Sequence, residues 1–216
     1  MSAAKGLHIG LMALIALLAG ALLWAAFFWQ PQPPQPSAAP DQDLPPGTLD
    51  LRLAAMGGPF TLDSADGAVT LDDLRGKVVL IYFGYTFCPD ACPTNLAIMA
   101  AGFSQMSEEE LAQVQGVFVS VDPDRDTLER LKQYTGYFHP RIMGVTGTAE
   151  QLAGVARRYG ASYQIGVAKT AGGYLVDHSS YIHVVDQQGN LLFALPHAVA
   201  PELMVETIRT LLNTDR

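Results

Sequence analysis

The longest hydrophobic run lies near the beginning of the chain, where residues 6–29 contain no Asp, Glu, Lys or Arg. A helix of this length measures roughly 36 Å, which exceeds a hydrocarbon core of about 30 Å. Residues 31–46 follow with seven of the chain's 14 prolines, a composition typical of an extended spacer. The pattern predicts three parts: a transmembrane anchor at 6–29, a Pro-rich linker at 30–56 and a folded domain at 57–216.

Two features beside this run indicate its orientation. Lys5 precedes the hydrophobic residues, and aromatic side chains gather at their far end, at Trp24, Phe27, Phe28 and Trp29. Positive charge favours the cytoplasmic side and Trp favours the interface, so we expect a cytoplasmic N-terminus and an exported C-terminal domain. The run is longer than the hydrophobic part of a signal peptide, which has about 7–15 residues. A buried core helix is the alternative interpretation.

Beyond the linker, buried strands and amphipathic helices alternate. The apolar run at 78–83 is typical of a strand covered on both faces. The spacing of Leu96, Met99, Ala100 and Phe103 predicts a helix over 92–106. The other predicted elements are a hairpin at 60–71, a strand at 117–121, a helix from Asp126 to about 138, a strand at 142–145, a helix at 149–159, a hairpin at 181–194 and a helix at 201–212. This order predicts an α/β sandwich with a mixed sheet and helices on both faces.

The composition excludes several classes of protein. Thirteen Lys and Arg against 21 Asp and Glu give a net charge of −8, and no basic cluster is longer than Arg157-Arg158. Nucleic-acid binding is therefore not expected. The chain has only two cysteines, too few for a disulfide scaffold or a four-cysteine zinc site. The chemistry depends on where those two cysteines lie.

Cys88 and Cys92 lie between a predicted strand and a predicted helix, in the sequence YFGYTFCPDACP at 82–93. Residues four positions apart share a helix face, so we expect both sulfurs to meet beyond the carboxyl edge of the sheet. The helix N-terminus favours the thiolate form. Such a pair can close a static disulfide bond, exchange disulfides with a partner or bind a soft metal ion.

A third metal ligand would come from one of the five histidines. His178 is best placed, because it precedes the strand predicted at 181 and its polar neighbours can orient the imidazole. His183 is interpreted as a satisfied sheet residue, and His139 as a residue that caps carbonyls at a helix end. His197, after the last strand, remains an alternative ligand.

The acidic residues near these motifs have structural interpretations. Asp122, Asp124 and Asp126 could form a hard-metal cluster, but we expect them to stabilise the start of a helix, with Asp126 as its cap and Glu129 three residues on. Asp90 is expected to be a solvated loop residue rather than a ligand.

Four motifs in the same order resemble the Sco/SenC family of membrane-anchored copper proteins. They are YFGYTFCPDACP at 82–93, VSVDPDRDT at 119–127, GVTGT at 144–148 and Asp177-His178-Ser179. Cysteine pairs recur in thioredoxins and peroxiredoxins, whereas three residues between the cysteines together with a downstream Asp-His-Ser point to this family. The resemblance spans residues 57–212.

The resemblance implies a thioredoxin-like fold with an added N-terminal hairpin. It also implies that Cys88, Cys92 and His178 bind copper, as Cu(I) or Cu(II). The implied role is to deliver copper to the dinuclear copper (CuA) site of cytochrome c oxidase, or to reduce the cysteines of that site. The expected partners are the oxidase copper subunit, a copper donor protein and the inner membrane, with the soluble domain in the periplasm. The tail at 196–201 departs from the family pattern and leaves the partner contacts open.

Two functions from different classes fit these residues. A metallochaperone would bind one copper ion, and two soft thiolates with one imidazole suit Cu(I), whereas zinc prefers a fourth ligand. A thiol–disulfide oxidoreductase would need only the two cysteines, and His178 would matter little to exchange. A peroxiredoxin is disfavoured because Thr86-Phe87-Cys88-Pro89 replaces the expected pattern, in which a threonine and a proline shortly precede a single attacking cysteine. Whether the protein is an enzyme is left open.

Overall fold

The structure, a computed structural model, describes residues 12, 24, 44–52, 54–166 and 173–214. Apart from Met12 and Trp24, the predicted anchor lies outside the described residues, as does the predicted linker up to residue 43. Within the part of the chain that the structure describes, no helix combines the length and the apolar character needed to cross a bilayer. Residues Leu44–Arg216 form one compact unit.

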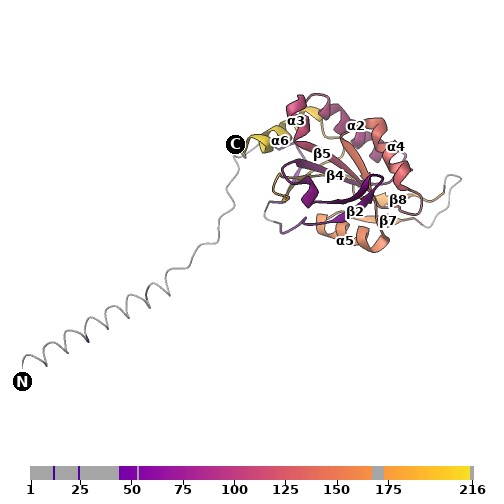
Figure 1. The fold of residues 1–216 in the computed structure, drawn as a ribbon, viewed down its shortest axis with the longest axis horizontal. Helices are drawn as coiled ribbons and strands as arrows, with labels where there is room; N and C mark the ends of the chain where they lie inside the picture. The colour runs from indigo at the N-terminus through magenta and orange to yellow at the C-terminus, as the bar shows by residue number, and fades with distance from the viewer. Residues whose placement is uncertain (1–11, 13–23, 25–43, 53, 167–172, 215–216) are drawn as a thin grey trace, which may run out of the picture. The chain divides into compact units, whose positions relative to one another are not determined.

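The secondary structure of this unit alternates between strands and helices (Figure 1). The elements are β1 (Leu49–Asp50), β2 (Thr61–Ser64), β3 (Gly67–Thr70), η1 (Asp72–Leu74), β4 (Val78–Gly84), α2 (Ala91–Phe103), α3 (Glu108–Ala112), β5 (Val114–Ser120), α4 (Leu128–Phe138), β6 (Ile142–Val145), α5 (Ala149–Tyr159), β7 (Tyr163–Ile165), β8 (Val176–His178), β9 (Ile182–Val185), β10 (Leu191–Leu195) and α6 (Pro201–Thr214).

A six-stranded mixed sheet forms the centre of the unit, with the strand order β1-β10-β9-β4-β5-β6. β4 pairs in parallel with β5 and antiparallel with β9, and every residue of β4 is buried. This confirms the prediction of a strand covered on both faces. Its side chains alternate: the even-numbered residues from Val78 to Tyr82 enter one hydrophobic cluster, and the odd-numbered residues from Val79 to Phe83 enter another.

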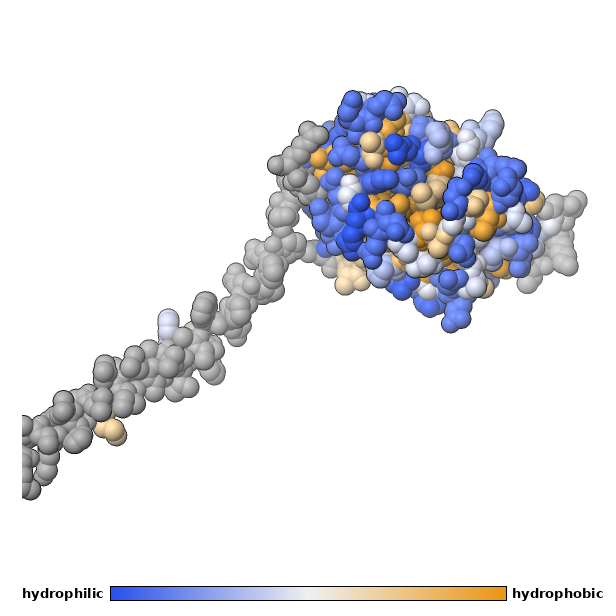
Figure 2. Space-filling view, in the orientation of Figure 1, coloured by the Kyte–Doolittle hydropathy of each residue, from blue (hydrophilic) through white to orange (hydrophobic). Residues whose placement is uncertain are grey.

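Different helices cover these two clusters (Figure 1). The cluster that contains Tyr82 lies under α2, α4 and α6, which bury Met99, Leu131 and Ile208 against it. The cluster that contains Phe83 lies under α5 and the β2–β3 hairpin. Hydrophilic side chains cover most of the face seen in Figure 2, with hydrophobic side chains between them. The predicted sandwich with helices on both faces is confirmed.

The ends of several elements differ from the prediction, and some elements were not predicted. The helix expected to reach residue 106 ends at Phe103, and the strand expected to begin at residue 117 begins at Val114. The sequence reasoning missed β1, η1, α3 and the β7–β8 pair. A signal for α3 is present in the sequence, because Ser107 and Glu110 form a capping box in which each side chain accepts from the other residue's N–H.

Candidate metal centre

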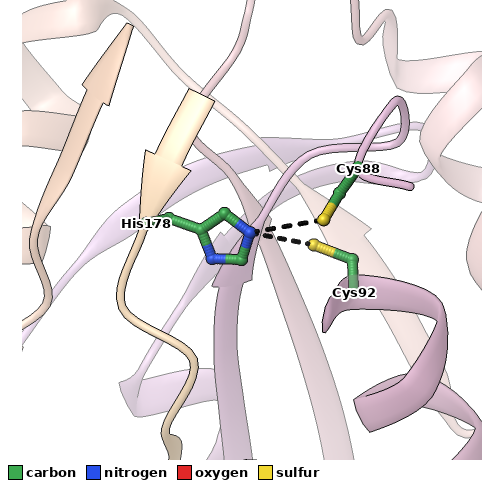
Figure 3. A group of neighbouring side chains, drawn as sticks. All are labelled: Cys88, Cys92 and His178. Atoms are coloured by element: carbon green, nitrogen blue, oxygen red, sulfur yellow. Dashed lines mark hydrogen bonds between the residues drawn. The ribbon is translucent and has the colours of Figure 1, made fainter. Parts of the chain in front are cut away.

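Cys88 lies in the loop that joins β4 to α2, and Cys92 lies in the first turn of α2 (Figure 3). The prediction that both cysteines share a helix face was wrong, because α2 begins at Ala91 and Cys88 precedes it. The loop turns back on itself instead, so that the N–H of Cys88 donates to the carbonyl of Tyr85 at 3.2 Å. Both sulfurs still reach one point beyond the carboxyl end of β4, where both cysteines are free thiols.

Gly84, the last residue of β4, makes room for the sulfur of Cys92. It continues the even-numbered series that faces α2. A Cβ at Gly84 would collide with Cys92 Sγ and would lie 3.0 Å from a ring carbon of Phe118. Because glycine lacks that atom, a fully buried thiol packs directly against the backbone of the sheet.

His178 is the last residue of β8, which pairs with β7 outside the central sheet. Its Nδ1 lies 3.1 Å from the carbonyl oxygen of Ser179, so we assign a proton to Nδ1. In the neutral imidazole, Nε2 then carries the lone pair. Tyr82 and Tyr85 both meet the imidazole at nearly right angles, with ring centroids 6.1 Å and 5.8 Å away. These contacts hold Nε2 toward the sulfurs.

The three side chains converge as Figure 3 shows. His178 Nε2 lies 3.5 Å from Cys88 Sγ and 3.4 Å from Cys92 Sγ, and the three donor atoms lie within 4.8 Å of one another. Among the described residues, this is the one group of His, Cys, Asp and Glu side chains arranged so that it could hold a metal ion. Cys92 is buried, whereas Cys88 and His178 are half-buried, so solvent reaches the group past the latter two.

The surroundings shift the pKa values of the two thiols in opposite directions. The hydrogen bond with Cys92 lowers the pKa of Cys88, partial burial opposes this, and the hydrogen bonds with His178 and with the N–H groups of Asp90 and Cys92 lower it further. Burial raises the pKa of Cys92, and the neighbouring Cys88 raises it again. Burial lowers the pKa of His178, but the Cys88 thiolate and the Ser179 carbonyl outweigh this, so the net shift is upward. Cys88 is therefore the thiolate of the pair.

A buried carboxylate ties the Cys88 loop to the sheet. The N–H and the hydroxyl of Thr86 donate to Asp126 at 2.8 Å and 2.6 Å, and the hydroxyl of Ser120 donates to it at 2.6 Å. The prediction that Asp126 caps a helix was wrong. Thr127 is the N-cap of α4, and its hydroxyl accepts from the N–H of Arg130. An Asp-Thr pair before a helix offers two candidate caps, and the hydrogen-bond donors of half-buried Thr86 and buried Ser120 engage Asp126 instead.

Asp122 is a second buried carboxylate that the sequence reasoning assigned to a helix start. Its side chain is fully buried and accepts from Arg125 Nε and from the hydroxyl of Tyr174, each at 2.5 Å. Asp124 is exposed, and Asp90 is exposed as predicted. No sequence signal separates a helix-start aspartate from one that pairs with a residue some fifty positions away.

The other described histidines do not join the donor group. His139 ends α4, and its Nδ1 accepts from the N–H of Arg141 at 3.0 Å instead of capping a carbonyl as predicted. His183 is buried in β9 against Phe83, and its Nδ1 has no hydrogen-bond partner among the described residues. His197 is exposed after β10.

Comparison with known proteins identifies the family. Residues 50–213 match the SCO1/SenC family model. The chain belongs to the SCO1/SenC family. It is 41% identical over 140 residues to Protein SCO1 homolog 1, mitochondrial, of Arabidopsis thaliana, covering 64% of this chain and 42% of that protein. It is 40% identical over 165 residues to Protein SCO2 homolog, mitochondrial, of Bos taurus, covering 75% of this chain and 62% of that protein.

A solved structure of a SCO1/SenC relative confirms the fold. The crystal structure of Arabidopsis thaliana ScoI with copper bound is 35% identical to this chain, with a TM-score of 0.69. The match covers 74% of this chain and 99% of that one. The thioredoxin-like Sco fold expected from the sequence motifs is therefore shown. The chain spans about half the length of the mitochondrial relatives that it matches.

Proposed function

We propose that this protein is a copper metallochaperone that binds one copper ion through Cys88, Cys92 and His178. The observation that carries the proposal is the convergence of two sulfurs and Nε2 within 4.8 Å at the end of β4. The copper-bound ScoI relative supports the choice of metal. The ion is cargo here, which the protein takes up from a donor protein and passes on by exchange of ligands.

The donor atoms suit Cu(I). Thiolates are soft ligands that favour Cu(I) over hard cations, and two thiolates with one imidazole complete a three-coordinate site. Zinc prefers four ligands, and the described residues offer no fourth side chain of a suitable kind in the group. The proton on Nδ1 of His178 leaves Nε2 as the ligand atom, and a bound ion would replace any proton on Nε2.

The recipient that we propose is the CuA site of the copper subunit of cytochrome c oxidase, as the family resemblance implies. We also propose that residues 6–29 form a single-pass anchor in the inner membrane, with residues 30–56 as linker and 57–216 as a periplasmic copper domain. The absence of charge at 6–29 and the prolines that follow support this arrangement. A C-terminal fusion to a reporter that is active only in the periplasm tests the orientation.

The free thiols and their opposite pKa shifts favour a second candidate function, reduction of a partner disulfide. The thiolate of Cys88, the more accessible sulfur, would attack one sulfur of the partner disulfide and release the other as a thiolate. Cys92 would then lose its proton and attack Cys88, forming a Cys88–Cys92 disulfide and releasing the second partner thiolate. The protein pair would be oxidised by two electrons, and the partner reduced by two.

Copper binding and disulfide exchange can be separated with one substitution. The reduced full-length protein, purified in detergent, is titrated with Cu(I) against a competing chelator. We expect the parent to bind one ion and His178→Ala to lose at least tenfold in affinity, while its rate of disulfide exchange stays within a few-fold of the parent. His197→Ala is the matched control, because His197 is exposed and outside the donor group. Parent-like affinity in His178→Ala would refute the three-ligand site.

A further inference from the structure

The two segments that supply the donor atoms are far apart in the sequence and must be held in register. Cys88 and Cys92 follow β4, whereas His178 ends the small β7–β8 pair. β7 and β8 pair only with each other, so the ladder of the central sheet does not fix their position relative to the cysteines. The side-chain contacts between the two segments therefore determine how closely Nε2 approaches the sulfurs.

The side chain of Arg125 touches both segments. On the histidine side, its Nη1 donates to the carbonyl of Tyr174 at 2.8 Å, and the guanidinium lies over the Tyr174 ring at 3.7 Å from the centroid. On the cysteine side, the same guanidinium lies 4.7 Å from the ring centroid of Phe87 and 5.5 Å from that of Tyr85. Phe87 immediately precedes Cys88, and Tyr174 lies four residues before His178, so one cation contacts an aromatic ring in each of the two segments.

Asp122 fixes the guanidinium in this place. Its buried carboxylate accepts from Arg125 Nε at 2.5 Å, and its other oxygen accepts from the hydroxyl of Tyr174 at 2.5 Å. A buried carboxylate is tolerated when a charge and hydrogen bonds compensate it, and here both come from Arg125 and Tyr174. The carboxylate thus orients the arginine and the tyrosine of the histidine segment together.

We propose that Arg125 is a positioning residue for the metal centre. It joins residues 174–178, which include β8, to the Cys88 loop so that His178 Nε2 faces both sulfurs. This inference rests on the proposed copper-binding function. Lysine could not replace Arg125, because an ammonium group lacks the planar fork that binds a carboxylate and a carbonyl while its face lies on an aromatic ring. Arg125 acts through His178 and does not itself touch the ion.

Arg130 provides a matched control. The guanidinium of Arg130 also lies over the Phe87 ring, 4.1 Å from its centroid, and its Nε donates to the hydroxyl of Thr86 at 2.7 Å. Within the described part of the chain, Arg130 contacts the cysteine loop, Asp126 and Thr127, and no contact reaches the β7–β8 pair. A substitution at Arg130 therefore perturbs the Phe87 stacking without loosening the histidine side.

The experiment measures Cu(I) affinity in a mutant cycle on the full-length reduced protein. We expect Arg125→Gln to weaken binding by about 10–100-fold, the range typical of residues that orient a metal-ligating histidine, and Arg130→Gln by less than threefold. Arg125→Lys should not rescue the affinity. In a His178→Ala background, Arg125→Gln should cause no further loss. An equal loss in that background, or an unchanged affinity in Arg125→Gln, would overturn the positioning role.

A second measurement needs no copper and keeps the two proposals separable. In the metal-free proteins, amide hydrogen exchange should become faster at residues 173–178 in Arg125→Gln and stay unchanged there in Arg130→Gln. Unchanged exchange at 173–178 in Arg125→Gln would overturn the positioning role of Arg125, whether or not the parent binds copper. If the two variants differ in exchange as expected but the parent protein binds no copper, the proposed function is refuted, whereas the role of Arg125 in joining the two segments stands.

Discussion

The Cys88 loop and the β7–β8 pair supply donor atoms to one group, yet different interactions hold them. Cys92 is fully buried against the central sheet, and Thr86 beside Cys88 donates twice to the buried carboxylate of Asp126. The β7–β8 pair lies outside that sheet and exposes Ile165 and Leu175. The core thus buries the Cys92 sulfur itself, whereas on the histidine side it holds Val176 of β8, and polar and aromatic contacts orient the imidazole.

This difference would matter for the metallochaperone function proposed above, in which the protein must release its ion. A ligand held by few contacts opens at a lower free-energy cost than one packed into the core. We therefore expect His178 to leave the copper first during transfer, while the two sulfurs keep their positions. A structural zinc site, in contrast, gains from ligands that are all held tightly.

Asp126→Ala should give the largest loss of stability on the cysteine side. It leaves the hydroxyls of Thr86 and Ser120 and the N–H of Thr86 without their acceptor, at a cost of about 3 kcal/mol in the free energy of unfolding. Urea denaturation of the metal-free protein measures it. Asp124→Ala, at an exposed position, should change stability by less than about 0.5 kcal/mol. A loss below about 1 kcal/mol for Asp126→Ala would contradict a core-fixed loop.

Gly84→Ala tests whether the sheet backbone sets the position of the Cys92 sulfur. The new Cβ would meet Cys92 Sγ and the ring of Phe118, so we expect a loss of about 2 kcal/mol and a clear drop in Cu(I) affinity. Gly154→Ala is the control, because a Cβ there meets no atom within 4 Å and the residue lies inside α5. That variant should gain up to about 1 kcal/mol. Equal behaviour of the two variants would argue against the close packing.

A pH titration separates a core histidine from the histidine of the site. Burial lowers the pKa of His183 to about 4, so the unfolded chain binds a proton near pH 6.5 while the folded chain resists it. The free energy of unfolding therefore decreases as the pH falls from about 6.5 toward about 4, by on the order of 2 kcal/mol at pH 5. The pKa of His178 is raised, so its effect on stability is opposite. Its contribution to the free energy of unfolding is present below about pH 6.5 and is lost as the pH rises through the pKa of the folded state.

Replacing each histidine checks these signs. His183→Leu should reduce the drop in melting temperature between pH 7 and pH 5, whereas His178→Ala should not reduce it, because the raised pKa of His178 acts in the opposite direction. An undiminished drop in His183→Leu would show that other groups cause the acid sensitivity.

Tyr174→Phe should have the smallest effect on global stability. It removes one donor from Asp122, which keeps its bond to Arg125, so the cost is about 1 kcal/mol. Amide exchange should increase in β8 but not in α2, because the lost bond lies on the histidine side. A uniform increase across both segments would mean that the same interactions hold the cysteine side and the histidine side.

The hydrophobic pattern predicted most of the fold because burial in this sheet follows sequence periodicity. The uninterrupted apolar run from Val78 to Phe83 is typical of a strand covered on both faces, and β4 is such a strand. β7 and β8 were missed because they have three residues each and no alternating pattern long enough to detect.

The motifs and the family resemblance led us to expect Cys88, Cys92 and His178 together, but the side chains that support them could not be predicted. The spacing of Cys88 and Cys92 and the polar neighbours of His178 are local signals, and the three side chains do meet. Arg125 contacts Tyr174, 49 positions away, and that kind of pairing has no local signature. Likewise, Asp126 matched the pattern of a helix cap, and only its hydrogen bonds with Thr86 and Ser120 in the folded chain reveal its actual partners.

The hydrogen bond between His178 Nδ1 and the Ser179 carbonyl joins two adjacent residues. Because both groups belong to the same stretch of chain, the choice of protonated nitrogen travels with the imidazole when that stretch shifts. The ring can therefore swing away from the sulfurs and return without exchanging its tautomer. Residues Val176–Ser179 would therefore keep the tautomer of His178 in any surroundings, whereas the direction of its Nε2 still depends on the rings of Tyr82 and Tyr85.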